Sequence, residues 1–161
     1  MNWQSALTAG FVATVVMTTM MSGSQSLRLT RMSVPFMLGT IFTPDRDRAR
    51  LLGFVVHLLN GWWIALVYGA LFETQGDATW WAGAAMGLVH GIFVLVALMP
   101  ILPGLHPRMA SEQRGPTPTK ELEPPGFMAL NYGRRTPISV IVSHVVYGII
   151  LGLMYQTAAT A

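Results

Sequence analysis

Residues 57–68 read HLLNGWWIALVY, and they lie within a longer stretch, residues 51–72, that contains no Asp, Glu, Lys or Arg. A helix needs about 20 predominantly apolar residues to cross the hydrocarbon core of a bilayer. Working outward along the chain, three more uncharged blocks of similar length occur at residues 5–23, 81–102 and 137–155. The sequence therefore predicts an all-α membrane protein with four transmembrane helices.

The composition excludes several other classes of protein. Of the 161 residues, 52% are hydrophobic and only 11% are charged, against about 25% charged in a typical soluble domain. The chain has no cysteine, which excludes disulfides, thiolate metal sites and cysteine nucleophiles. It also lacks a carboxylate pair, a Gly-rich phosphate loop and a His-Glu metal motif. We therefore predict no catalytic residues and no metal site, and do not expect an enzyme.

The basic residues predict the orientation. All ten fall in two of the three loops, residues 24–50 and 103–136, whereas the loop at residues 73–80 carries only Glu73 and Asp77. They are Arg28, Arg31, Arg46, Arg48, Arg50, Arg108, Arg114, Lys120, Arg134 and Arg135. The positive-inside rule makes both basic loops cytoplasmic and both termini periplasmic in a bacterial inner membrane. This rule also explains the basic net charge without a nucleic-acid partner.

An internal repeat is predicted from matching motifs. His57, Gly61 and Tyr68 recur with the same spacing as His144, Gly148 and Tyr155. AGFVATVVM (9–17) aligns with AGAAMGLVH (82–90), and PFMLGTIFTP (35–44) with PGFMALNYGRRTP (125–137). The shared order favours two tandem helical hairpins, repeat one at residues 1–72 and repeat two at residues 81–161. Because both start on the same side, they would be parallel repeats about an axis along the membrane normal.

Glycines four residues apart mark the expected helix-packing faces. Small residues at this spacing let helices approach closely in lipid. The glycines are Gly53, Gly61, Gly69, Gly83, Gly87, Gly91, Gly148 and Gly152. His57, His90 and His144 lie on or beside these faces, and Tyr68 and Tyr155 fall close to the same side of their helices. These five side chains are the candidate binding residues.

The histidines allow more than one interpretation. His57 and His144 could ligate a haem b between two helices, with Gly61 and Gly148 leaving room for the macrocycle. Interhelical hydrogen bonds, to partners such as Asn60, Ser139, Ser143 or backbone carbonyls, are the simpler reading and the one we favour, since small-residue faces need no cofactor. A third interpretation is a proton or solute pathway through His90. The absence of carboxylates from the predicted membrane helices argues against it.

Four stretches carry a resemblance that covers nearly the whole chain: AGFVATVVMTTM, FMLGTIF, PPGFMALNYGRRTP and SHVVYGIILGLMY. Together they resemble a family of small, uncharacterised bacterial four-helix inner-membrane proteins. The resemblance implies a polytopic inner-membrane fold and supplies no activity or site residue.

The expected function is a non-catalytic integral subunit or accessory protein that packs against a larger membrane complex. Glycine-rich faces, Trp62 and Trp63 in mid-helix, and the lack of a catalytic set motivate this hypothesis. Membrane lipids and other integral subunits, or a second copy of the chain, would be its partners. The alternatives are a haem b- or quinone-associated electron-transfer component using His57 and His144, and a small-solute or proton transporter.

Overall fold

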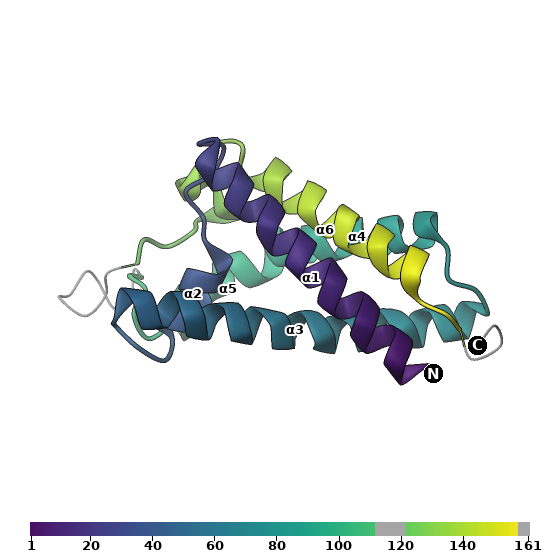
Figure 1. The fold of residues 1–161 in the computed structure, drawn as a ribbon. Coiled ribbons are helices and arrows are strands. Elements are labelled where there is room, and N and C mark those ends of the chain that lie inside the picture. The colour runs from purple at the N-terminus through teal and green to yellow at the C-terminus, as the bar shows by residue number, and fades with distance from the viewer. Residues whose placement is uncertain (112–121, 158–161) are drawn as a thin grey trace.

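The computed structural model describes residues 1–111 and 122–157, and within them every regular element is a helix (Figure 1). The elements are α1 (Trp3–Ser26), α2 (Val34–Thr40), α3 (Arg46–Gln75), α4 (Trp80–Phe93), the π-helical turn η1 (Val94–Leu98), α5 (Met99–Leu105), the 3₁₀ segment η2 (Phe127–Tyr132) and α6 (Thr136–Met154). A single backbone bridge joins Met109 to Leu122.

Four helical stretches are long and apolar enough to cross a membrane: α1, α3, the run Trp80–Leu105 made of α4, η1 and α5, and α6. The prediction of an all-α protein with four such helices is confirmed. Their ends lie within a few residues of the expected ones. The largest difference is at α3, which begins five residues earlier than the predicted helix because Asp45 caps it, accepting a hydrogen bond from Arg48 N at 2.8 Å.

The start of α1, the end of α3 and the end of α6 lie at one end of the bundle, which we call the termini end (residues 1–5, 73–80 and 153–157; Figure 1). There Asn2 N donates to the Tyr155 hydroxyl at 3.1 Å, and that hydroxyl donates to Glu73 Oε1 at 2.7 Å. Burial, together with the hydrogen bond to Glu73, raises the pKa of Tyr155 to about 12. These contacts hold α1, the end of α3 and the end of α6 together.

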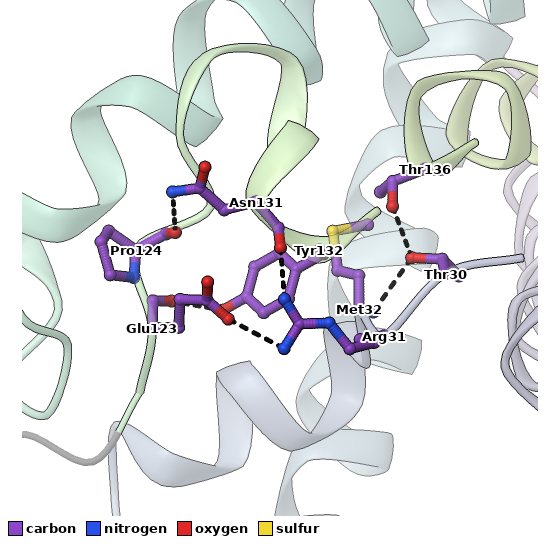
Figure 2. Close-up of polar contacts among 8 residues, drawn as sticks. All are labelled: Thr30, Arg31, Met32, Glu123, Pro124, Asn131, Tyr132 and Thr136. Carbon is purple, nitrogen blue, oxygen red and sulfur yellow. Dashed lines mark hydrogen bonds and ion pairs between the residues drawn. The ribbon is translucent and has the colours of Figure 1, made fainter. Parts of the chain in front are cut away.

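The opposite, basic end comprises residues 27–50 and the described part of residues 103–135. Two of the basic residues assigned to this side, Arg114 and Lys120, lie outside the described residues. Figure 2 shows how the segment after α1 is bound to the segment before α6. Thr30 and Thr136 share a hydrogen bond of 2.7 Å between hydroxyls, and Arg31 N donates to Tyr132 O at 2.8 Å.

Tyr132 also binds the segment around Glu123 to this end of the bundle (Figure 2). Its hydroxyl donates to Glu123 O at 2.5 Å, while the Glu123 carboxylate pairs with Arg31 at 3.1 Å. Burial and the Glu123 carboxylate raise the pKa of Tyr132 to about 12, against the opposing effect of Arg31. The two loops of the basic end therefore form one hydrogen-bonded unit.

Backbone contact between α4 and α6 is made possible by facing glycines. A Cβ added to Gly83 would lie 2.0 Å from Gly148 O, and one added to Gly148 would lie 1.9 Å from Gly83 O. Both distances are far below van der Waals contact, so any side chain here would force the helices apart. The α1–α3 contact is similar but involves side chains, since a Cβ on Gly61 would meet Thr14 Oγ1 at 1.8 Å.

The other candidate packing glycines also face neighbouring elements. Gly53 meets Pro35 O of α2, Gly69 the Tyr155 ring, Gly87 His144 O, Gly91 Ile141 and Gly152 Thr79 O. Close packing thus links α2 to α3, α3 to α1, α1 to α6 and α6 to α4.

A proline changes the course of the third of these long helices, the run Trp80–Leu105. Pro100 has no N–H, and its ring would clash with the carbonyl four residues earlier in a regular helix. The chain widens into the π turn η1 just before it, where Met99 N donates to Val94 O, five residues back. This turn separates α4, which packs on α6, from α5, which runs toward α2 (Figure 1).

Candidate functional site

A cleft of about 400 Å³ lies on the side of the bundle where α3 faces the α4–η1–α5 run, with walls completed by α1, α2 and α6. Its lining residues are Met17, Met21, Met32, Val34, Met37, Leu38, Ile41, His57, Asn60, Gly61, Trp63, Ile64, His90, Val94, Leu98, Met99, Ile101, Leu102, Leu105, His106, Val140, His144 and Tyr147. Among the described residues, no Asp, Glu, Lys or Arg lines it.

The mouth of the cleft opens onto the outer surface of the helices. Trp63 is 67% exposed, Leu105 74% and Ile101 53%, although all three line the cleft. These residues belong to helical stretches that are long and apolar enough to cross a membrane, and such a surface is suited to contact with acyl chains. A lipid-soluble molecule could therefore enter sideways from the bilayer.

Five methionines line the cleft and keep much of it apolar: Met17, Met21, Met32, Met37 and Met99. Thioether side chains are flexible and polarisable and adapt to irregular shapes. This wall could accommodate ligands of somewhat different outline.

Two of the histidines touch each other. The rings of His90 and His144 are 4.6 Å apart between centroids and nearly perpendicular, at 84°. This contact follows from the glycine packing of α4 on α6, since Gly87 lies against His144 O and His90 comes three residues after Gly87. His144 Nδ1 donates to Val140 O at 2.8 Å, which leaves Nε2 available to a ligand.

Aromatic rings pack behind this pair. Tyr68 meets Tyr147 edge-on, with 5.7 Å between centroids, and lies 6.2 Å from His90. Within the described residues, the Tyr68 hydroxyl and His90 Nδ1 are buried polar atoms without a hydrogen-bond partner. Unpaired buried polar atoms are rare in native proteins and mark places where a water or a ligand group belongs.

His57 and Asn60 present their polar groups from the middle of α3. His57 is buried and Asn60 is exposed, and neither side chain makes a hydrogen bond to any residue that the structure describes. The interhelical hydrogen bonds expected for the three histidines are therefore not found among the residues that the structure describes. His144 instead bonds to its own helix.

The cleft thus contains His57, His90 and His144, with Tyr68 directly behind His90. Tyr155, the fifth candidate, lies at the termini end on Phe72 and Glu73. His57 and His144, the two histidines of the repeat, both line the cleft, and the ring in contact with His144 is that of His90.

Two lining residues did not stand out in the sequence as site residues. Tyr147 is almost fully buried, and its hydroxyl donates to Gly61 O at 2.6 Å. Its position three residues after His144 puts it on the same helix face, a spacing that could have identified it.

His106, which follows the last residue of α5, is buried and lines the cleft at its basic end. Its Nε2–H donates to Met37 O at 2.9 Å, while Nδ1 accepts from Arg108 N at 3.1 Å. Burial and the Arg108 guanidinium lower the pKa of His106, despite the opposing effect of the hydrogen bond to Met37. The ring joins the end of α5 to α2.

Comparison of the chain with protein families, curated proteins and solved structures finds no match. The site is therefore interpreted from its own chemistry. Among the described residues, no group of three or more His, Cys, Asp or Glu side chains is arranged to hold a metal ion. The arrangement offers imidazole and amide groups at one part of an apolar, laterally open cleft.

Proposed function

We propose that the protein is a non-catalytic integral membrane subunit that binds a neutral, ring-headed lipid of the quinone type in this cleft. The observation that carries the proposal is the pair His57 and Asn60. Both present unbonded polar groups in the middle of a membrane-spanning helix, beside an apolar cleft. Polar groups at that depth are costly and mark functional sites.

The size and lining of the cleft support a neutral amphiphile. Pockets for small molecules typically measure about 300–1,000 Å³ and are mostly apolar with a few polar groups. A quinone has two carbonyl oxygens that accept hydrogen bonds, and an imidazole N–H or the Asn60 amide can donate them. A charged ligand would meet no compensating charge among the described lining residues. The ligand's apolar tail would leave between Trp63 and Leu105.

Fluorescence quenching tests the proposal, because quinones quench nearby indole rings. A short-chain benzoquinone added to the protein in neutral detergent should quench its fluorescence saturably. Trp63→Phe should remove most of this change. Trp62→Phe should keep it, because Trp62 donates to Leu7 O and packs against Phe11 on α1, outside the cleft lining.

The polar contacts are tested by a matched pair of substitutions. Asn60→Ala should weaken binding by roughly 3- to 10-fold, the loss of one hydrogen bond. The adjacent Leu59→Ala, which is exposed but does not line the cleft, should leave it unchanged. Equal quenching of the wild type and both variants, without saturation, would mean simple partitioning into detergent and would exclude the site.

The second candidate is a haem b held by His57 and His144. The hydrogen bond from His144 Nδ1 to Val140 O favours it, because metal-binding histidines commonly fix their second nitrogen in this way. A Soret band in the purified protein, lost in both His57→Ala and His144→Ala, is the expected result. No Soret band after expression with adequate haem would exclude this candidate.

The proposal also includes membership of a larger membrane complex. We further propose that the protein is related to the small, uncharacterised bacterial four-helix inner-membrane proteins that its sequence resembles. Gentle detergent extraction followed by native electrophoresis should show the protein co-migrating with a much larger assembly. A lone monomer would count against the accessory role while leaving the cleft's ligand testable by fluorescence.

We further propose a bacterial inner membrane with the basic end cytoplasmic, which the position of all described arginines at that end supports. The tandem repeat is supported by equivalent contacts. The first hairpin has Gly10 against Ala65 and Thr14 against Gly61. At the aligned positions of the second hairpin, Gly83 lies near Gly152 and Gly87 near Gly148.

A further inference from the structure

A second hollow, of about 720 Å³, lies at the basic end between the end of α1 and the start of α6. Its lining residues are Gln25, Leu27, Arg28, Leu29, Thr30, Arg31, Tyr132, Gly133, Arg134 and Arg135. Four of these ten are arginines, brought together from two loops that are about 100 residues apart in sequence. It shares no residue with the cleft.

The charges of the hollow are only partly compensated. Arg31 pairs with Glu123 at 3.1 Å and donates to Asn131 O, which holds it against the wall (Figure 2). Arg28, Arg134 and Arg135 have no ion-pair partner among the described residues. Guanidinium groups of like charge around one concavity repel each other, and an anion between them removes that repulsion. The planar fork of arginine matches phosphate oxygens in particular.

Arg28 occupies a backbone position that usually belongs to glycine. Arg28 N donates to Gln25 O and Leu29 N to Ser24 O, the two hydrogen bonds of a Schellman motif that ends α1. Arg28 is the left-handed residue of this motif, with φ of 56°. A side chain with a Cβ is strained there, and such strain is concentrated at functional sites. Arg28 lines the hollow and brings to it a guanidinium group that glycine would lack.

The hollow lies at the ends of two helices that are long and apolar enough to cross a membrane, where lipid headgroups would be expected. Leu27 follows the last residue of α1, and Arg135 precedes the first residue of α6. Both helices are among the four candidate membrane spans. Leu27 is 72% exposed at the rim, an apolar surface suited to the glycerol and upper acyl region of a lipid. Basic pockets between membrane helices bind anionic headgroups in this way.

We propose that this hollow binds the phosphate of an anionic phospholipid headgroup. The lipid's phosphate would lie among Arg28, Arg134 and Arg135, with its acyl chains passing Leu27 into the bilayer. The inference is independent of the ligand proposed for the cleft.

The test compares lipids on the full chain purified in neutral detergent. Phosphatidylglycerol should raise the melting temperature saturably and remain as an adduct in native mass spectrometry, whereas phosphatidylcholine should not. Inorganic phosphate at the same concentration should have no effect. An equal response to inorganic phosphate would overturn the assignment to a lipid in favour of a soluble anion.

Two sets of variants make the test specific. Removal of one basic residue near a membrane surface weakens binding of an anionic lipid about fivefold, so the triple variant Arg28→Gly, Arg134→Gln, Arg135→Gln should lose the preference for phosphatidylglycerol. The triple variant Arg46→Gln, Arg48→Gln, Arg50→Gln removes the same charge from the same end, outside the hollow, and should keep it. Equal loss in both triples would show a general effect of charge and overturn the proposal.

The single variant Arg28→Gly guards against misfolding, since glycine suits the left-handed backbone and α1 should end at least as stably as before. We expect this variant to melt at or above the wild-type temperature while binding phosphatidylglycerol about fivefold more weakly. Unchanged lipid binding in Arg28→Gly would contradict the proposed site.

Discussion

The polar residues at the two ends of the bundle differ in role from those in the middle of the long helices. His106 and Tyr155 are structural. His106 bonds to Met37 O of α2 and to the nearby Arg108 N, and Tyr155 bonds to Asn2 N and Glu73 from distant parts of the chain. His57, Asn60 and His90 differ because they leave hydrogen-bonding groups without partners among the described residues. The first group should govern stability and the second group ligand binding.

His106 should make stability depend on pH. Its pKa in the folded protein lies below the ordinary 6.5, so the folded state binds fewer protons than the unfolded state. The ring's contribution is therefore complete above about pH 6.5 and is lost as the pH falls below that value toward the folded-state pKa. Melting temperatures between pH 8 and pH 5 should fall more steeply in the wild type than in His106→Gln. Parallel curves would show that the ring does not titrate in this way.

Tyr155→Phe should loosen the termini end. The substitution leaves Asn2 N and Glu73 without their contacts to the hydroxyl, at a cost of about 1–2 kcal/mol. Equilibrium unfolding in detergent measures this cost, and quinone binding at the distant cleft should not change. A variant as stable as the wild type would mean that water replaces both hydrogen bonds.

The histidines also show where residue-level prediction from the sequence ended. The spacing of four residues between glycines predicted that the histidines lie on or beside glycine-rich helix faces. It did not predict the contact between His90 and His144, because that contact depends on the position of α4 along α6. The mutual contact of Gly83 and Gly148 sets that register, and no pattern within one helix contains it.

At the scale of elements, charge and hydropathy predicted the four long apolar helices closely, because an uncharged stretch of about 20 residues is by itself a strong signal for a helix of this kind. The π turn before Pro100 and the placement of α2 along α3 were not predicted, since both depend on tertiary packing. Both features contribute to the cleft, since α2, η1 and α5 all supply lining residues.

Gly148→Ala should be strongly destabilising. The new Cβ would lie 1.9 Å from Gly83 O, so α4 and α6 must separate, at a cost of about 1–3 kcal/mol. Gly23→Ala is the matched control, because a Cβ there has nothing within 4 Å and alanine favours the helix. Unfolding in detergent should show a loss for the first variant and none for the second. Equal stability would indicate that the two backbones are not in contact.

For the whole molecule, the natural absence of cysteine makes the orientation directly testable. Asp77→Cys lies at the termini end and Arg48→Cys at the basic end. In intact bacterial cells with a permeable outer membrane, an impermeant maleimide should label Asp77→Cys, and should label Arg48→Cys only after the inner membrane is opened. The reverse pattern would invert the proposed topology.

The bundle has one further mechanical property, which follows from the contact of Gly61 with Thr14. The uncharged part of α3, residues 51–72, is about 33 Å long at 1.5 Å per residue, close to a hydrocarbon core of about 30 Å. A thinner or thicker bilayer would change the tilt of α3, and the helix would rotate about its contact with Thr14 of α1. The occupancy of the cleft should therefore vary with acyl-chain length in nanodiscs, which would make the protein responsive to the thickness of its own membrane.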